Sequence, residues 1–252
     1  MNRIANYEEL KNRITTWIGD YVVQNNIKSL VIGVSGGIDS AVVSTLCAET
    51  RLPTYVLSMP LHSSTKNDDL SDSYCNTLEK KYGNVTKIRI DLTSTYDQLL
   101  KSFDFWTGEG EFTSNNLANA NTKSRIRMVT LYQVAGTVGG IVVGTGNKVE
   151  DYGVGFYTKY GDGGVDIAPI ADLYKTEVWE LGKHLGVDPR IVAASPTDGL
   201  WDDGRTDEDQ IGASYAELEE AMETGSGPGL EPLLKFSQMN QHKMNPIPTF
   251  KL

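Results

Sequence analysis

The residues best suited to chemistry lie between positions 30 and 43, where an apolar run leads into a glycine turn. Leu30 to Val34 is an apolar, β-branched run of the length expected of a buried strand. Ser35, Gly36 and Gly37 break this run, and positions 38–43 read as the first turns of a helix. The first N–H groups of a helix have no internal acceptor and lie at its positive end, so they attract anions. The stretch therefore predicts a phosphate-binding turn.

The side chains of this turn indicate a phosphate ligand accompanied by a cation. Gly36 and Gly37 allow a close backbone approach and positive φ, while Ser35 and Ser40 offer hydroxyl donors. Asp39 only accepts hydrogen bonds when ionised, so beside phosphates it needs a cation between them. A turn that merely caps an ordinary helix is the alternative, which Ser-Gly-Gly alone would favour. The chain contains neither G-x-x-x-x-G-K-[ST] nor G-x-G-x-x-G.

A second polar stretch, at positions 144–150, reads G-T-G-N-K-V-E and follows an expected strand. In an open parallel sheet, ligands bind beyond the carboxyl ends of the strands, where the strand order reverses. Glu150 could then face Asp39 across the crevice, and two carboxylates with phosphate oxygens suit Mg²⁺. The alternative for Glu150 is a solvated loop charge.

Two more stretches carry charge without a decisive pattern. Positions 158–166 read T-K-Y-G-D-G-G-V-D, a tight loop in which Lys159 offers a cation and Asp162 an acceptor. Positions 121–128 read N-T-K-S-R-I-R-M. Arg125 and Arg127 are two apart on a helix and cannot share a face, so one can meet a ligand while the other meets protein or solvent. A plain glycine loop and a solvated basic turn are the simpler readings, and spacing alone favours them.

The elements that must position these residues alternate between strand and helix. The alternation predicts one α/β domain over 1–252, with a doubly wound, mainly parallel five-stranded sheet in the order 3-2-1-4-5 and helices on both faces. Positions 108–120 and 195–205 are expected as loops, and 206–252 as a C-terminal helical segment. Strands are expected at 30–34, 54–59, 85–92, 141–145 and 165–170, and helices at 6–25, 38–49, 68–82, 95–106, 121–138, 172–185, from Thr206 onward and at 231–241.

Composition narrows the class of protein. The net charge of −10 argues against a nucleic-acid substrate, whose binding depends on many Lys and Arg contacts. No apolar segment is long enough to span a membrane, and the first residues lack a signal-peptide pattern. Two cysteines are too few for a disulfide framework, and the three histidines lack metal-ligand spacing. These features predict a cytoplasmic protein.

The motifs together resemble those of NAD synthetases, which are N-type ATP pyrophosphatases. The resemblance runs from the first helix to about Lys243 and is carried by S-G-G-I-D-S, N-x-K-x-R-x-R-M, G-T-x-N-K-x-E, T-K-Y-G-D-G-G-x-D, L-x-K-x-x-V, P-T and a late H-K. It implies amidation of nicotinic acid adenine dinucleotide (deamido-NAD) to NAD with ATP, Mg²⁺ and a nitrogen donor. Some members carry an N-terminal glutaminase domain. Here the glycine turn begins at residue 35, which leaves no room for one, so free ammonia is the implied donor. The resemblance also implies a homodimer with the dinucleotide near the interface, where Lys159 could act across it.

The resemblance assigns roles position by position. It implies ATP binding by Gly33, Val34, Ser35, Gly36, Gly37, Ile38, Asp39, Ser40, Thr145, Lys175 and Thr197. It implies deamido-NAD binding by Arg125, Lys159, Asp162, His242 and Lys243, and Mg²⁺ binding by Asp39 and Glu150. Asp39, Asp162, Lys175 and Thr197 are the predicted catalytic residues.

The sequence departs from the family pattern at three places. The common P-T-A-D-L reads P-T-D-G-L at 196–200, Gly146 stands where many relatives have a polar residue, and Ser124 replaces an alanine. The implied chemistry is attack of the nicotinate carboxylate on the ATP α-phosphorus, followed by ammonia attack on the acyl-adenylate. It needs no protein nucleophile. The rival functions are amidation of another carboxylate or amide, a tRNA-modifying activity, and a nucleotide-sensing module that does not cleave ATP.

Overall fold

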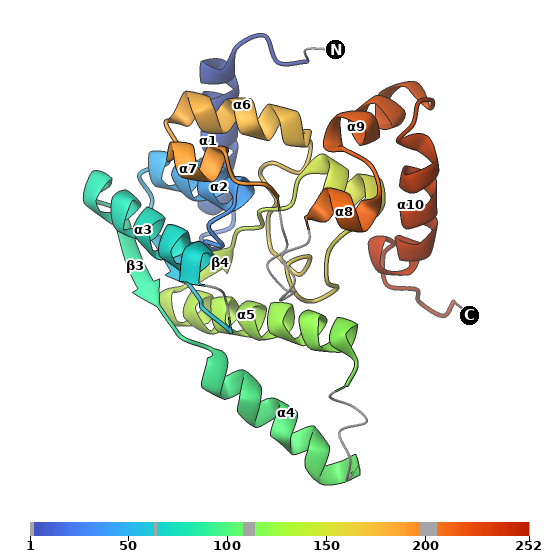
Figure 1. Cartoon of the computed structure of the whole chain (residues 1–252). Coiled ribbons are helices and arrows are strands. Elements are labelled where there is room, and N and C mark those ends of the chain that lie inside the picture. Colours follow the sequence, from blue (N-terminus) through green and yellow to red (C-terminus); the bar gives the residue numbers. More distant parts are fainter. Residues whose placement is uncertain (1–2, 63–64, 108–113, 197–205, 252) are drawn as a thin grey trace.

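A four-stranded parallel sheet lies at the centre of the computed structural model (Figure 1), which describes residues 3–62, 65–107, 114–196 and 206–251, without the side chains of 65–69 and 104–107. The strand order is β3-β2-β1-β4, and every neighbouring pair is parallel. β1 is central, so Val31 lies opposite both Tyr55 and Val142. The strands are β1 (Ser29–Gly33), β2 (Thr54–Ser58), β3 (Val85–Arg89) and β4 (Gly140–Val142).

The prediction of a fifth strand at 165–170 is wrong, although this segment runs beside the end of β4. It makes one isolated parallel bridge, between Val143 and Ile167. The Asp166 carboxylate accepts the Val142 N–H at 2.7 Å, so a side chain replaces the next ladder partner. Pro169 has no N–H to donate, which limits pairing from the other end. The sheet order is therefore 3-2-1-4 rather than 3-2-1-4-5.

Helices cover both faces of this sheet, which confirms the predicted doubly wound parallel architecture. One apolar core cluster joins the sheet to α1, α2, α3, α6 and α7, and a second joins its other face to α4 and α5. Their bounds are α1 (Tyr7–Gln24), α2 (Ile38–Glu49), α3 (Thr65–Lys81), α4 (Thr93–Thr107), α5 (Asn116–Val138), α6 (Lys175–Leu185) and α7 (Pro189–Val192).

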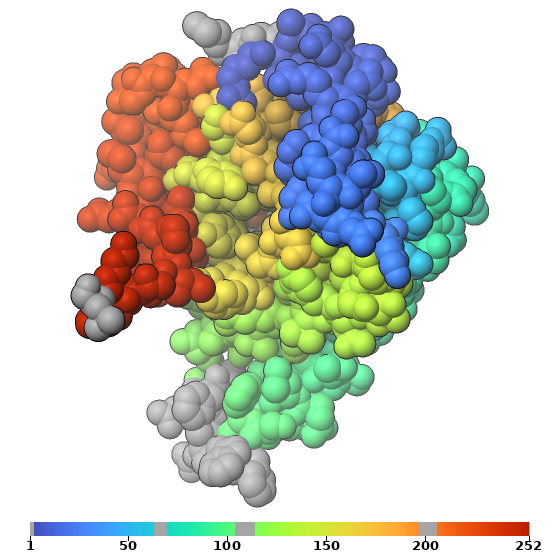
Figure 2. Space-filling view, turned by 180° about the vertical axis from the view of Figure 1, so that it is seen from behind, coloured from blue at the N-terminus to red at the C-terminus, as the bar shows by residue number. Residues whose placement is uncertain are grey.

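A third apolar cluster lies on one flank of the sheet. The helix predicted at 231–241 is confirmed there, whereas the sequence predicted neither the helix at 148–154 nor a break in the helix expected from Thr206. The cluster joins η1 (Lys148–Val154), a π-helix, to α8 (Asp207–Ile211), α9 (Tyr215–Thr224) and α10 (Leu230–Met244). The view from behind also shows the C-terminal residues on the flank opposite α3 (Figure 2). On this flank α9 and α10 pack against η1, which directly follows the loop after β4.

Two helix boundaries differ from the expectation for identifiable reasons. α5 begins at Asn116, within the expected loop 108–120, because the Asn115 side chain accepts the Ala118 N–H and caps it. The helix expected from Thr206 ends at Gly212, where φ is 85°. A Ser214 capping box then starts α9. Across the described ranges, no helix combines the length and apolar character needed to cross a membrane.

Candidate active site

The glycine turn after β1 has the backbone geometry of an anion site. Gly36 has φ of 90°, and Gly37 is the N-cap of α2 without a side-chain cap bond. The Ser40 hydroxyl donates to the Gly37 carbonyl at 3.0 Å and accepts the Ser35 N–H at 3.1 Å. The Gly37 N–H donates to Ser35 Oγ at 3.2 Å. Both predicted hydroxyl donors therefore hold the shape of the turn itself.

The structure brings three predicted site residues, Asp39, Glu150 and Lys175, into direct contact. The Lys175 ammonium lies 2.5 Å from Asp39 Oδ2 and 2.8 Å from Glu150 Oε1. Asp39 follows β1 and Glu150 follows β4, so the adjacency of these parallel strands puts both carboxylates at one edge of the sheet. Lys175, the first residue of α6, is 2% exposed. We call these three residues the acid–lysine cluster.

The cluster keeps Lys175 charged. Burial alone lowers the pKa of an ammonium, but the charges of Asp39 and Glu150 outweigh burial, so the pKa of Lys175 lies well above its ordinary value. The Lys175 ammonium thus lies between the two carboxylates and pairs with both.

Asn147 links the two acids, and the sequence interpretation did not assign it a role. Its side chain is fully buried and accepts the N–H groups of Val149 and Glu150, which caps η1. Its amide group lies 3.4 Å from Asp39 Oδ1. Asparagine three residues before a glutamate is an N-cap signal, so the role could have been found.

Asp151 is a second residue that the sequence interpretation missed. It follows Glu150 in η1, and a Cβ on Gly146 would lie 2.0 Å from its Oδ2, so Gly146 leaves room for this carboxylate. Burial, with the nearby charges of Glu150 and Asp162, raises the pKa of Asp151 to about 8. Gly146, where many relatives have a polar residue, therefore makes space for the side chain of Asp151.

A second group of predicted residues meets where loop 158–162 packs on α5, and we call it the loop–helix contact. The Asp162 carboxylate accepts the Thr158 N–H at 3.0 Å and the Ser124 hydroxyl at 2.7 Å. The Arg125 guanidinium donates to the Lys159 carbonyl at 3.2 Å. A Cβ on Gly161 would lie 2.2 Å from Ser124 Oγ, so this close approach requires glycine.

The remaining predicted residues lie apart from these two groups. The Lys243 ammonium donates to the Tyr157 carbonyl at 2.6 Å, which ties α10 to the segment before the loop–helix contact. His242 is exposed on α10. Thr145 is half-buried in the loop after β4. Thr197 lies outside the described residues.

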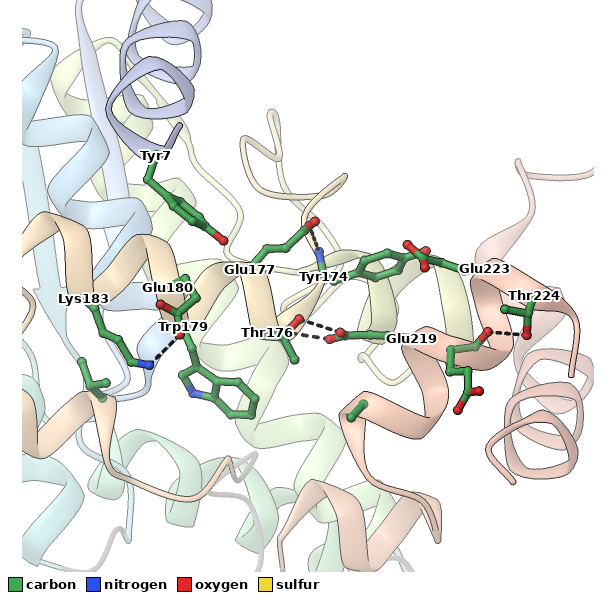
Figure 3. A pocket seen from close by; sticks show the side chains of 13 residues that line it. Tyr7, Tyr174, Thr176, Glu177, Trp179, Glu180, Lys183, Glu219, Glu223 and Thr224 are labelled. Carbon is green, nitrogen blue, oxygen red and sulfur yellow. Dashed lines mark hydrogen bonds and ion pairs between the residues drawn. The ribbon is translucent and has the colours of Figure 1, made fainter. Parts of the chain in front are cut away.

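A concavity among the described residues lies along α6 and α9, and none of the predicted site residues lines it. It has a volume of about 990 Å³ and is lined from α6 and α9, with Tyr7 of α1 at its edge (Figure 3). Five glutamates line it, and none of the three residues of the acid–lysine cluster does. Its lining includes Glu177, Glu180, Glu219, Glu220 and Glu223. The acidic lining makes it unsuited to phosphates.

Comparison with known proteins identifies the family of the chain. The sequence model of the NAD synthase family matches residues 10–249. The NH(3)-dependent NAD(+) synthetase of Carboxydothermus hydrogenoformans is 36% identical over 95% of this chain and 96% of its own length. The NMN synthetase of Francisella tularensis superposes with a TM-score of 0.89 at 31% identity, covering 99% of this chain and 100% of that one. The NH3-dependent NAD synthetase of Campylobacter jejuni superposes with a TM-score of 0.77 at 26% identity, covering 98% and 100%. A family match over nearly all of its length shows that the chain belongs to the NAD synthase family.

Proposed function

We propose that this enzyme is an ammonia-dependent NAD synthetase, a ligase that converts deamido-NAD, ATP and ammonia to NAD, AMP and pyrophosphate. The observation that carries the proposal is the acid–lysine cluster, set beside the glycine turn at the start of α2. This arrangement offers backbone N–H donors, one cation and two carboxylates at one edge of a parallel sheet. Family membership supplies the reaction class.

ATP would bind with its phosphates at the start of α2. The N–H groups of Ile38, Asp39 and Ser40 precede the first helical hydrogen bond, from Ala41 to Gly37, so they are available to phosphate oxygens. Lys175 would move from the acids to a phosphate oxygen, where its charge favours departure of pyrophosphate. Thr145 and Thr197 are also assigned to ATP by the resemblance.

The donor set suits Mg²⁺. Within the described ranges, no group of three or more His, Cys, Asp or Glu residues could hold a metal. Two carboxylates with phosphate oxygens and water are nevertheless a common magnesium environment, and Asp39 and Glu150 already point at one cation. Bound there, Mg²⁺ would neutralise the charge of the leaving pyrophosphate.

The loop–helix contact would hold the substrate to be amidated. Arg125, Lys159 and Asp162 meet there, and Lys243 bonds to Tyr157, the residue just before that loop. A carboxylate is a poor acyl donor and must first be activated. Its attack on the ATP α-phosphorus gives an acyl-adenylate and releases pyrophosphate. Ammonia then attacks the activated carbonyl and AMP leaves. The chain contributes mainly by positioning, because no protein nucleophile is required.

A mononucleotide substrate is the second candidate. It is favoured by one observation, because the Francisella NMN synthetase superposes better than the Campylobacter NAD synthetase, with TM-scores of 0.89 and 0.77. Nicotinic acid mononucleotide carries the same nicotinate carboxylate, so the same acid–lysine cluster would serve both reactions.

We propose a homodimer built on the exposed face of α5. Val129 is 70% exposed, Tyr132 40% and Tyr160 60%, and they line one shallow apolar surface next to the loop–helix contact. A second subunit covering this surface would bring its residues close to Lys159. Light scattering of the protein and of Val129→Glu tests the proposal, which a monomeric wild-type protein would refute.

One assay separates these functions. The purified protein is incubated with ATP, Mg²⁺, ammonium and either deamido-NAD or nicotinic acid mononucleotide, and NAD, nicotinamide mononucleotide, AMP and pyrophosphate are measured. We expect pyrophosphate release to depend on the pyridine substrate, with a higher kcat/KM for deamido-NAD. A preference for the mononucleotide supports the second candidate. ATP binding without pyrophosphate release would instead support a sensing module and refute both.

A further inference from the structure

α9 lies outside the sheet, yet its first residue reaches the acid–lysine cluster. The Tyr215 hydroxyl donates to Glu150 Oε1 at 2.7 Å. The Lys175 ammonium donates to the same oxygen at 2.8 Å and lies 5.0 Å from the centroid of the Tyr215 ring. One tyrosine therefore contacts two of the three residues of the cluster.

The position of Tyr215 is itself fixed by two further contacts and by burial. Its N–H donates to Glu208 Oε1 of α8 at 2.9 Å. Its ring meets Trp179 of α6 edge-on, with centroids 5.9 Å apart. The residue is 1% exposed. The side chain is therefore a rigid support for Glu150 rather than an adaptable surface contact.

The Tyr215 hydroxyl can donate one hydrogen bond, and the distances show which carboxylate accepts it. Glu150 Oε1 is 2.7 Å away and Asp207 Oδ2 is 3.2 Å away, so the shorter bond goes to Glu150. With both donors on Oε1, the other oxygen of Glu150, Oε2, is oriented by them. A carboxylate held in this way presents a defined oxygen to a ligand.

One turn further along α9, Glu219 fixes the start of α6. Its carboxylate accepts the Thr176 N–H at 3.0 Å and the Thr176 hydroxyl at 2.6 Å (Figure 3). Thr176 follows Lys175, so this contact holds the backbone from which the lysine projects. A carboxylate at a helix N-terminus is also favoured by the helix dipole.

We propose that Tyr215 is a positioning residue for the amidation reaction, acting through Glu150, and that Glu219 supports it by fixing the Lys175 backbone. α9 thereby orients Glu150 and Lys175 for binding of the nucleotide and its cation. The inference rests on the proposed roles of Glu150 and Lys175. It assigns a role in the reaction to a helix that contributes none of the predicted site residues.

The test compares Tyr215→Phe with Tyr74→Phe. Tyr74 is the matched control, because it is 5% exposed and its hydroxyl bonds to Thr45 Oγ1 at 2.7 Å, in the core between α2 and α3. The measurements are melting temperature, kcat, KM for ATP, and Mn²⁺ affinity in the presence of a non-hydrolysable ATP analogue. Loss of a residue that orients a metal ligand typically costs about 10- to 100-fold in metal affinity or activity.

We expect Tyr215→Phe to lose about 10-fold or more in Mn²⁺ affinity and kcat, while Tyr74→Phe stays within about twofold and melts at a similar temperature. Glu219→Gln, which keeps one acceptor for Thr176, should lose less than Tyr215→Phe. Values for Tyr215→Phe within about twofold of wild type would overturn the proposal, and so would equal losses in both tyrosine variants.

Failure of this inference can be told apart from failure of the proposed function. Mn²⁺ affinity is measured without the pyridine substrate, so it can be read even if the enzyme amidates another carboxylate. Glu150→Gln serves as the reference variant. If it binds Mn²⁺ as tightly as wild type, the metal assignment fails and Tyr215 loses its proposed role with it.

Discussion

The two halves of the candidate site are held together by different forces. The acid–lysine cluster consists of charges that are largely withdrawn from water, with Lys175 3% and the two acid side chains 17% and 16% exposed. The loop–helix contact uses short hydrogen bonds from Ser124 and Thr158 to Asp162, and a glycine that allows close approach. Removing a charge from the acid–lysine cluster should therefore cause a large loss of stability or turnover. Altering the packing of the loop–helix contact should cause a smaller, graded loss.

Lys175→Met should have the largest effect. Removing one partner of a buried ion pair leaves uncompensated charge and costs about 3–5 kcal/mol, so we expect that loss in the free energy of unfolding together with loss of turnover. Lys183→Met is the control, because Lys183 lies on the same helix and pairs with Glu180 at 2.6 Å on the surface. Urea unfolding curves that shift equally for both variants would contradict a buried cluster.

Asp39→Asn should abolish turnover while leaving the fold intact. The amide keeps the size of the side chain but weakens the contact with Lys175 and with a divalent cation. Because a bound metal supplies several kcal/mol of transition-state stabilisation, kcat should fall by at least about a hundredfold. Asp172→Asn alters an exposed pair with Lys148 and should keep most of the activity. Near-normal turnover of Asp39→Asn would refute the metal assignment.

Gly161→Ala tests the other half and should have a graded effect. The new Cβ collides with Ser124 Oγ, so the loop must shift from α5, at a cost of about 1–3 kcal/mol. We expect a higher KM for the pyridine substrate with KM for ATP unchanged. Gly136→Ala, in open space on α5, is the control. A rise in KM for ATP instead would show that the two halves are not separable.

Asp151 lies between the halves, and its variant should change how stability depends on pH. The pKa of Asp151 is raised from 3.8 to about 8. Between about pH 4 and pH 8 this carboxyl is therefore protonated in the folded protein and ionised in the unfolded chain. This residue therefore makes stability fall as pH rises from about 4 to 8.

Asp151→Asn should remove that fall. Melting temperatures from pH 5 to 9, measured without metal or nucleotide, should decline less steeply for the variant than for wild type. Asp20→Asn on the exposed side of α1 is the control. Parallel curves for wild type and Asp151→Asn would show that the carboxylate is not protonated in the folded state.

The same contrast explains which parts could be predicted from the sequence. The turn from β1 into α2 is a local pattern of apolar run, glycine and helix, and the strand–helix alternation indicated the parallel sheet. The meeting of Asp39 with Glu150 followed from the adjacency of β1 and β4. These features depend on short segments and on general rules of sheet topology.

The remainder depends on contacts that no short segment encodes. The segment 165–170 has the composition of a strand, but Asp166 bonds to the Val142 N–H and stops the ladder. The contacts of Tyr215 with Glu150 and of Glu219 with Thr176 form only when α9 packs against η1 and α6. Asn147 is the exception, because its capping pattern was visible in the sequence.

The central position of β1 has a consequence for how substrates enter. β1 is bonded on both sides, and nearly all of α2 is buried between layers. Amide protons of β1, and of α2 from Ala41 onward, should exchange with deuterium only when the whole molecule unfolds. The proposed phosphate-binding turn therefore joins the two segments that should open most slowly. A motion that admits a nucleotide would have to come from the peripheral helices.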